Sequence, residues 1–462
     1  MQENRKNKRS HNHKTVVLAA TGSHRGKTTI TSALLCKLKE QDCRVRAFKC
    51  GPDYIDPMFH QAVLGVPSRN LDTFFTDEVT TRRLFAHEME NYDLSIVEGV
   101  MGLYDGIGGV EVTGSTYDLA RTLNAPVVLI VDGYGMGRSI IAEIKGFLSL
   151  DESHLIKGVV LNRVSKSFYQ TIRPVIEEEA GVKLLGYFPD RKELRLESRY
   201  LGLKLPGENK QLMQMLELAA EQLKESAPEL IDFCEGEGRE VYDDVYLSKE
   251  AKGDYDEYLS GARIAIAQDE AFCFYYEDNL RILKEAGAKL VTFSPLHDAH
   301  LPEGIDGLIL GGGYPELYAR ELEKNASMKA EIKAFYDAKK PIIAECGGFM
   351  YLHETLIDEN GVKYRLVGAL PATVRHTGHL VRFGYVTIED KTTHRAIKGH
   401  EFHYYDSTLN GSDCVAKKPS TQKSWECMHL IEGSYLGFPH LYYPSNPEFV
   451  RDFLCYRGTL SL

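Results

Sequence analysis

The chain has 462 residues and a net charge of −11, from 66 acidic and 55 basic side chains. This length exceeds one ordinary hydrophobic core, so two or three domains are expected. Hydrophobic residues make up 43% and charged residues 26%, as in globular proteins. The excess of acidic over basic side chains argues against nucleic-acid binding. The sequence contains no run of eighteen apolar residues, the length that a membrane-spanning helix needs.

The cysteines and the N-terminus indicate a cytoplasmic protein. Nine cysteines are scattered without a CxxC pair, which favours a reducing compartment over a disulfide framework or a zinc site. The first fourteen residues are polar and basic and lack the apolar core of a signal peptide. We interpret residues 1–14 as a disordered tail, with a transit peptide as the alternative.

Short apolar runs alternate with helical patterns over residues 15–235. The expected strands are residues 15–20, 44–48, 94–97, 126–131 and 158–161, and the first helix is residues 28–39. Buried strands that alternate with helices are typical of a parallel sheet covered on both faces. This region is therefore predicted to form a first α/β domain.

The segment ATGSHRGKTT (residues 20–29) lies between the first strand and the first helix. A turn there points backbone N–H groups and a helix N-terminus at an anion. We expect Gly26, Lys27, Thr28 and Thr29 to bind ATP, with Lys27 on the β- and γ-phosphates and the Thr28 hydroxyl on Mg²⁺. Thr21 stands where a Walker loop has glycine, but GKTT is intact. The alternative is a Gly-rich turn that happens to carry lysine.

Acidic residues follow the second and third expected strands, in the segments FKCGPDYIDP (48–57) and VEGVMGLYDG (97–106). Loops at the carboxyl ends of neighbouring parallel strands converge on one crevice, so Asp53 and Glu98 are expected to meet Thr28 around Mg²⁺. Lys49 is expected to stabilise charge on a transferring phosphoryl group. The alternative is that Asp53 and Asp56 only form Asx turns beside their prolines.

A second alternation of strands and helices follows a charged segment, residues 236–260, which we interpret as a linker. Expected strands are residues 263–267, 289–293, 307–310 and 341–344, and residues 276–285 are an expected helix. No internal repeat is visible. The sequence therefore predicts two different α/β domains, residues 15–235 and 261–462.

Cys346 stands between a strand and a helix in PIIAECGGFM (341–350). A cysteine at such an elbow is presented as a nucleophile, and the helix N-terminus is expected to lower its thiol pKa. Gly347, with Gly312 and Gly313 after an earlier strand, could supply oxyanion-stabilising N–H groups. A buried, inert cysteine is the alternative. The spacing leaves the base open among the downstream histidines His353, His376, His379, His394, His400, His403, His429 and His440.

Five longer segments resemble the cobyrinic acid a,c-diamide synthase family of corrinoid biosynthesis. They are GPDYIDPMFH (51–60), PSRNLDTF (67–74), VEGVMGLYDG (97–106), GGGYPELYA (311–319) and ECGGFMYL (345–352). The resemblance runs from about residue 15 to about residue 455. It implies a P-loop domain similar to dethiobiotin synthetase, followed by a class I glutamine amidotransferase domain of the cobyric acid synthase type.

The resemblance also implies a reaction. Glutamine is hydrolysed at Cys346 through a glutamyl thioester, and the released ammonia attacks an acyl phosphate made with MgATP. The a and c acetates of cobyrinic acid or a related tetrapyrrole become amides. The amidotransferase domain is expected to use a Cys–His pair without a triad carboxylate.

The family's functional positions transfer to numbered residues of this chain. They imply phosphate-loop roles for Lys27 and Thr28, acidic roles for Asp53, Asp56, Glu98 and Asp105, and the nucleophile at Cys346. Asp56 and Asp105 are expected to bind the substrate. The family's histidine stretch resembles YLHLHF, and here SYLGFPHLYY (434–443) offers only His440 as the base. GHEFHY (399–404), with His400 and His403, is expected at a substrate or domain interface, or in a packed structural role.

Other readings remain open at this point. Cobyric acid synthase is disfavoured by GPDYIDP, whereas nickel-sirohydrochlorin and hydrogenobyrinic acid stay as alternative substrates. From a different class, a non-catalytic P-loop regulator with a degenerate amidotransferase module is argued against by the intact Cys346 and GKTT. The sequence leaves the oligomeric state open, a homodimer included.

Overall fold

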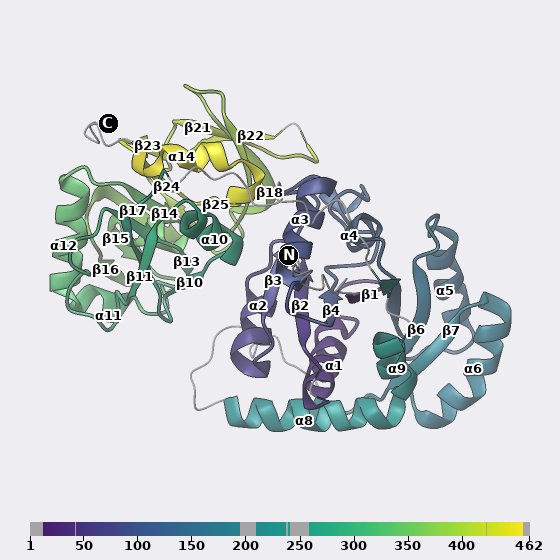
Figure 1. Cartoon of the computed structure of the whole chain (residues 1–462). Coiled ribbons are helices and arrows are strands. Elements are labelled where there is room, and N and C mark those ends of the chain that lie inside the picture. Colours follow the sequence, from purple (N-terminus) through teal and green to yellow (C-terminus); the bar gives the residue numbers. More distant parts are fainter. Residues whose placement is uncertain are drawn as a thin grey trace, which may run out of the picture. The chain divides into compact units, whose positions relative to one another are not determined.

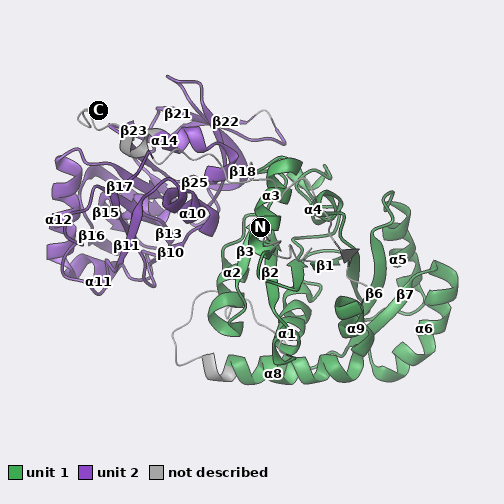
Figure 2. Cartoon of the chain, in the orientation of Figure 1, with its two compact units in different colours: residues 1–251 green, residues 252–462 purple. Residues whose placement is uncertain are grey.

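The computed structural model describes residues 13–41, 43–194, 209–236, 239–240, 258–421 and 423–455. The chain divides into two compact units, Met1–Ala251 and Lys252–Leu462 (Figure 2). Residues 1–12 of the expected tail lie outside the described residues, and Lys14 already belongs to a strand. Most of the expected linker also lies outside them, and its Arg239–Glu240 form a short strand, β8.

Unit 1 is built on a parallel sheet, as the alternating apolar runs predict (Figure 1). Its strand order is β3-β2-β4-β1-β5-β6-β7, and β8 pairs antiparallel with the start of β1. The central strands are apolar because helices cover both faces of such a sheet. The strands are β1 (Lys14–Ala20), β2 (Val45–Cys50), β3 (Ser68–Leu71), β4 (Leu94–Glu98), β5 (Val127–Asp132), β6 (Ile156–Asn162) and β7 (Lys183–Phe188).

The helices of unit 1 begin where the sequence supplies capping side chains. Asp77, Ser115 and Ser165 each accept a hydrogen bond from a backbone N–H of the first turn. The helices are α1 (Lys27–Glu40), α2 (Ile55–Phe59), α3 (Glu78–Met89), α4 (Thr116–Leu123), α5 (Ser139–Ser149), α6 (Lys166–Ala180), α8 (Asn209–Ser226) and α9 (Pro228–Gly236), with the turns η1 (His60–Leu64), η2 (Ile107–Gly109) and η3 (Lys192–Leu194).

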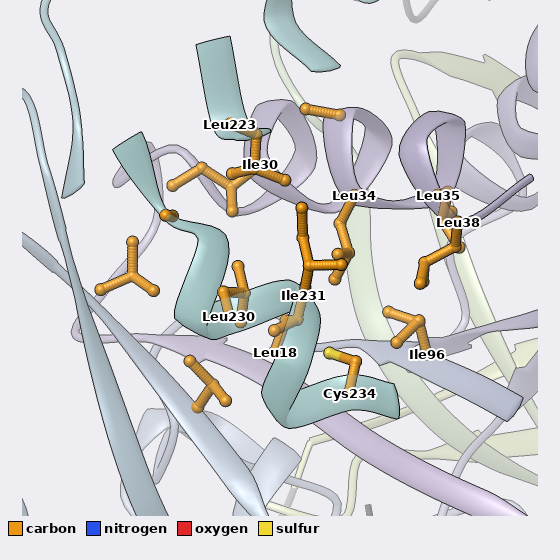
Figure 3. Close-up of a cluster of buried hydrophobic side chains, with 14 of the residues drawn as sticks. Leu18, Ile30, Leu34, Leu35, Leu38, Ile96, Leu223, Leu230, Ile231 and Cys234 are labelled. Carbon is orange, nitrogen blue, oxygen red and sulfur yellow. The ribbon is translucent and has the colours of Figure 1, made fainter. Parts of the chain in front are cut away.

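The core between the sheet, α1, α8 and α9 fixes the position of α1 (Figure 3). Ile30 and Leu34 of α1 pack in one cluster with Leu18 of β1, Leu223 of α8 and Ile231 of α9. Each such side chain contributes roughly 1.5–3 kcal/mol when fully buried. The turn that opens α1 is therefore attached to a well-packed element.

Unit 2 contains a second, six-stranded sheet with the order β11-β9-β12-β14-β24-β23, parallel except at β23. Its strands are β9 (Arg263–Ala267), β11 (Lys289–Phe293), β12 (Gly307–Leu310), β14 (Ile342–Glu345), β23 (His429–Ile431) and β24 (Ser434–Gly437). The helices are α10 (Glu277–Glu285), α11 (Ala319–Lys324), α12 (Ala326–Asp337), α13 (Gly347–Tyr351) and α14 (Pro447–Cys455), with a turn η5 (Tyr443–Ser445).

Unit 2 also carries strands that the sequence did not predict. One sheet has the order β16-β15-β17-β20 and another the order β22-β21-β18-β19-β25, while β10 (Phe272–Phe274) pairs with β13 (Gly312–Gly313). The remaining strands are β15 (His353–Ile357), β16 (Lys363–Arg365), β17 (Leu370–His376), β18 (Arg382–Asp390), β19 (Ala396–His403), β20 (Tyr405–Ser407), β21 (Cys414–Lys417), β22 (Ser424–Cys427) and β25 (His440–Leu441).

In the part of the chain that the structure describes, no helix combines the length and apolar character needed to cross a bilayer.

Candidate active sites

The turn between β1 and α1 forms a phosphate loop. Gly26 precedes α1 with a φ of 93°, a left-handed conformation that glycine adopts without strain. The first backbone N–H groups of α1, from residue 27 onward, give its N-terminus a preference for anions. Asn162 at the end of β6 holds this loop, because its Nδ2 donates to the backbone carbonyl of Arg25 at 2.9 Å.

Lys27 reaches across the phosphate loop. Its Nζ donates to the carbonyl oxygen of Gly22 at 3.1 Å and to that of Met101. Burial, together with the charge of Lys49, lowers the pKa of Lys27 to about 8. These contacts hold the ammonium at the loop, where phosphate oxygens could replace the two carbonyls.

A cluster of buried charges adjoins the start of α1. The Thr28 hydroxyl donates to Oε1 of Glu98 at 2.7 Å, and Lys49 Nζ donates to the same oxygen at 3.1 Å. Lys49 also forms an ion pair with Asp56. The structure therefore brings together four residues that the sequence proposed for this site, although Lys49 is enclosed between two carboxylates.

The two carboxylates of this cluster differ in their protonation. Burial and the neighbouring Glu98 raise the pKa of Asp56 to about 7, although Lys49 opposes that rise. Burial would raise the pKa of Glu98 as well, but Lys49, His60 and Thr28 hold it well below its ordinary value. Glu98 is therefore ionised at neutral pH, and a carboxylate is the type of ligand that a hard cation prefers.

The other two acidic candidates lie differently. Asp53 Oδ1 accepts a hydrogen bond from the backbone N–H of Ile55 at 2.8 Å, which is an Asx turn, and the residue also lines the cavity beside the phosphate loop. Asp105 Oδ2 accepts from the backbone N–H of Gly102 at 2.8 Å. Asp105 thus stabilises its own loop and is not among the residues that line the cavity.

The cavity beside the loop has a volume of about 540 Å³. It is lined by phosphate-loop residues with Asp53 and Asp56, and by residues at or after the carboxyl ends of β6 and β7. The sequence reasoning missed these latter residues, although their places after apolar strands in an open α/β sheet were a usable signal. They are Asn162, Arg163, Phe188, Pro189, Asp190, Arg191 and Leu194.

Cys346 lies at a sharp turn between β14 and α13. Its φ of 47° and ψ of −103° are strained for a residue with a side chain. Its backbone N–H donates to the carbonyl oxygen of Gly437 in the neighbouring β24 at 2.9 Å. This is the predicted elbow, and strain of this kind is common at nucleophiles.

His440 lies on β25, three residues after β24 ends. Its Nδ1 is 3.9 Å from Oε2 of Glu345, the residue that precedes Cys346. Its ring stacks on that of His400 in the adjacent β19, with centroids 4.9 Å apart. The candidate base and the candidate nucleophile thus lie at the same end of the central sheet.

The three candidate oxyanion glycines surround this region. A Cβ added to Gly312 would lie 2.4 Å from His440 Cε1, so the backbone there touches the ring. A Cβ added to Gly347 would lie 3.1 Å from the backbone nitrogen of Gly313 and 2.9 Å from Cδ of Pro315. Residues 312–315 therefore pack directly against the turn that carries the candidate nucleophile.

The thiol of Cys346 is protonated in the free protein, contrary to the expectation from the helix N-terminus. Burial, with the nearby carboxylates of Glu316 and Glu401, raises the pKa of Cys346 well above its ordinary value. The backbone N–H of Gly347 opposes this rise but does not outweigh it. The expected lowering was wrong because it neglected the desolvation of the site.

The imidazole of His440 is neutral, as a general base requires. Burial, with the neighbouring His400 and His403, lowers the pKa of His440 well below its ordinary value. His400 faces the candidate base, whereas His403 is packed in the core. Nε2 of His403 lies 2.8 Å from Glu401 Oε2, and its ring stacks on Phe438.

The fold and the two sites define a class of protein: a nucleotide-binding P-loop domain joined to a glutamine amidotransferase domain, as in glutamine-hydrolysing ligases. Residues 16–203 match the CobQ/CobB/MinD/ParA nucleotide binding domain. Residues 263–436 match the CobB/CobQ-like glutamine amidotransferase domain.

Full-length relatives narrow the class to one family. The chain is 38% identical over 456 residues to the cobyrinate a,c-diamide synthase of Caldanaerobacter subterraneus, covering 95% of this chain and 97% of that protein. It is 37% identical to the enzyme of the same name from Fusobacterium nucleatum, covering 95% and 99%. The chain belongs to the cobyrinate a,c-diamide synthase family. A solved glutamine amidotransferase is also similar, at 16% identity with a TM-score of 0.32. This similarity covers 42% of this chain and 99% of that one.

Proposed function

We propose that this protein converts the a and c acetate carboxylates of cobyrinic acid into amides, using ATP and glutamine. The observation that carries the proposal is the match to enzymes named cobyrinate a,c-diamide synthase over 95% of this chain. The residues at both candidate sites suit the two half-reactions that such an amidation needs.

The first half-reaction releases ammonia from glutamine in unit 2. His440 takes the proton of the Cys346 thiol, and the sulfur attacks the side-chain amide carbon. The N–H groups of Gly313 and Gly347 would stabilise the resulting oxyanion. The imidazolium then returns the proton to the leaving nitrogen, so ammonia departs and a glutamyl thioester remains for water to hydrolyse.

The second half-reaction activates a carboxylate in unit 1. Lys27 and the N-terminus of α1 would bind the β- and γ-phosphates of ATP, and the residues after β6 and β7 would surround the base. Asp56 and Asp105 are proposed to bind the macrocycle. The substrate carboxylate attacks the γ-phosphorus of ATP, and ADP leaves with the electrons of the broken β–γ bond. Ammonia then attacks the acyl phosphate, so phosphate leaves and the amide forms.

Magnesium is the cation that we propose for the ATP site. The Thr28 hydroxyl and the Glu98 carboxylate are already 2.7 Å apart and provide oxygen ligands of the type Mg²⁺ prefers. Asp53, on the wall of the same cavity, is the third proposed ligand. When bound, Mg²⁺ would neutralise charge on the phosphate oxygens.

The test is an amidation assay on three macrocycles. The purified protein is incubated with ATP, Mg²⁺ and glutamine, and with cobyrinic acid, hydrogenobyrinic acid or nickel-sirohydrochlorin, and amidated carboxylates are counted by mass spectrometry. We expect two amidations of cobyrinic acid. If cobyrinic acid is not amidated but one of the other two macrocycles is, the proposed substrate is wrong and the proposed reaction stands. No amidation of any of them would contradict both.

A further inference from the structure

The ends of strands β5 and β6 hold one residue of the phosphate loop by two separate contacts. Their last residues, Asp132 and Asn162, are paired in the register of the sheet. Asn162 Nδ2 donates to the backbone carbonyl of Arg25, and Nη1 of Arg25 donates to Oδ2 of Asp132, both at 2.9 Å. Arg25 directly precedes Gly26, after which α1 begins. The two contacts therefore fasten the turn that leads into the N-terminus of α1.

Asp132 also binds a second arginine, at the wall of the cavity. Arg163 follows β6 and is among the residues that line the cavity beside the phosphate loop. Its Nε donates to Oδ1 of Asp132 at 2.8 Å, and its Nη2 donates to Oδ2. Its guanidinium carbon lies 5.0 Å from the centre of the Tyr134 ring. One carboxylate therefore links the phosphate loop to the part of the cavity wall that follows β6.

Asp132 itself does not line the cavity. Its side chain is 2% exposed, whereas the side chains of Arg25 and Arg163 are 44% and 33% exposed. A buried carboxylate is costly unless it is paired, and here two arginines share one. Asp132 can therefore influence a ligand in the cavity only through the two arginines or through its own charge.

We propose that Asp132 is a positioning residue for ATP, which holds the phosphate loop through Arg25 and the cavity wall through Arg163. This inference rests on the proposed binding of ATP at the phosphate loop. Hydrogen bonds between ionised groups are stronger than neutral ones and, when bidentate, fix the geometry of both partners. A site whose groups are held in place before the ligand arrives loses less conformational freedom on binding. Removing Asp132 should therefore cost ATP affinity.

The charge of Asp132 by itself would have the opposite effect. ATP carries several negative charges, so a nearby carboxylate repels it, and removal of that carboxylate should strengthen binding. If Asp132 acts by positioning the two arginines, its removal should weaken binding instead. The sign of the change in ATP affinity thus separates the two roles.

The test is isothermal titration of the full chain with MgATP. Asp132→Asn keeps the shape of the side chain but loses its charge, and Asp232→Asn, at an exposed position on α9, is the matched control. We expect Asp132→Asn to raise Kd for MgATP about tenfold or more, the effect of losing charged hydrogen bonds. Its kcat for amidation with ammonia at saturating ATP should stay within about threefold of the wild type. A variant that is only less stable would instead lower kcat and the number of binding sites per chain, and would leave Kd unchanged.

Two arginine variants test the route by which Asp132 acts. Arg25→Met and Arg163→Met each leave Asp132 one arginine partner, so they remain informative if Asp132→Asn does not fold. We expect each to raise Kd for MgATP at least about threefold. Each double variant with Asp132→Asn should bind MgATP within about threefold of Asp132→Asn alone. Arg138→Met, which removes an exposed ion pair with Glu179, is the control.

Two results would overturn the inference. One is a Kd for MgATP that is unchanged or lower in Asp132→Asn. The other is a set of double variants in which the two changes in Kd multiply, because Asp132 and the arginines would then act independently. A wild type that binds MgATP but gives either result refutes only the role of Asp132. A wild type that binds no MgATP refutes the proposed ATP site.

Discussion

Nε2 of His60 lies 3.1 Å from Oε2 of Glu98, and both side chains are fully buried. On the other side of the ring, Nδ1 lies 3.2 Å from the Ser68 hydroxyl, which holds the imidazole in this orientation. His60 is therefore in contact with the carboxylate that accepts a hydrogen bond from Thr28. The segment GPDYIDPMFH ends on this histidine, for which the sequence alone predicts no role.

Replacing His60 should weaken binding of the metal–nucleotide complex. Residues that orient a ligand carboxylate typically change metal affinity about 10- to 100-fold when lost. We expect that loss for His60→Ala, with part of the affinity retained in His60→Gln, whose amide can approach Glu98. Isothermal titration with MgATP measures the affinity for the metal–nucleotide complex. Titration with ATP in EDTA measures the affinity for the nucleotide without the metal. His154→Asn, at an exposed position, is the control, and equal affinities for all variants would exclude a positioning role.

Lys27→Ala should abolish amidation with glutamine and with ammonia alike, because the ammonium is held at the phosphate loop. We expect ATP affinity to fall at least about tenfold, the range for a lost charged hydrogen bond. Fluorescent-nucleotide titration measures the affinity, and exposed Lys145→Ala on α5 is the control. Full activity of Lys27→Ala would show that the phosphates bind elsewhere.

Cys346→Ala should separate the two half-reactions. Glutamine hydrolysis should disappear, while amidation supplied with ammonia continues at a rate close to that of the wild type. The partly buried Cys273 in the same unit provides the control variant Cys273→Ala. Glutamine hydrolysis by Cys346→Ala at the wild-type rate would disprove the assigned nucleophile.

The carboxyl of Glu345 should contribute little to the glutaminase rate at neutral pH, although its Oε2 lies 3.9 Å from Nδ1 of His440. Burial raises the pKa of Glu345 to about 8, so the group carries a proton at pH 7 and glutamine mimics it. We expect Glu345→Gln to change the glutaminase rate less than about threefold at pH 7, and His440→Asn to lower it at least about 100-fold.

The same pKa predicts where Glu345→Gln and the wild type diverge. As the pH rises through 8, the wild-type carboxyl ionises next to the sulfur and the variant does not. The ratio of the two glutaminase rates should therefore change between pH 7 and pH 9. A pH-independent ratio would mean that Glu345 does not titrate in this range.

Arg46 and Glu88 form a buried ion pair in unit 1 that makes stability depend on pH. Burial would raise the pKa of Glu88, but His87, Arg69 and Arg46 lower it to about 2. A carboxyl with a lowered pKa stabilises the fold above its unfolded-state pKa and loses this contribution as the pH falls toward 2. We expect Glu88→Gln to lose roughly 3 kcal/mol of unfolding free energy at pH 7.

Urea unfolding from pH 7 to pH 3 measures the unfolding free energies that check this pH dependence. The proteins compared are the wild type, Glu88→Gln and the exposed control Glu90→Gln. The difference between wild type and Glu88→Gln should shrink as the pH falls below about 4.5. A difference that stays constant over this range would show that the lost free energy has another origin, such as packing.

The parallel sheets and their sites were predictable because their signals are local. An apolar strand followed by GKTT predicts β1, the loop and α1, and an apolar strand followed by ECGG predicts the elbow. The strands after residue 353 were missed because their exposed faces carry polar residues, which leaves no continuous apolar run. The protonated state of Cys346 was also unpredictable, since it depends on burial and on Glu316 and Glu401, which are distant in sequence.

The pairing of β25 with β19 places the proposed base of unit 2 on a strand that comes late in the sequence. Strands β15 to β24 all lie between Cys346 and His440 in the sequence. During synthesis the thiol therefore leaves the ribosome long before its proposed base does. A nascent or truncated chain that stops before β25 carries the nucleophile but has no His440 to take its proton. With His440 as the proposed base, release of ammonia would thus be deferred until β25 is made, and the ATP-using unit precedes β25 in the sequence.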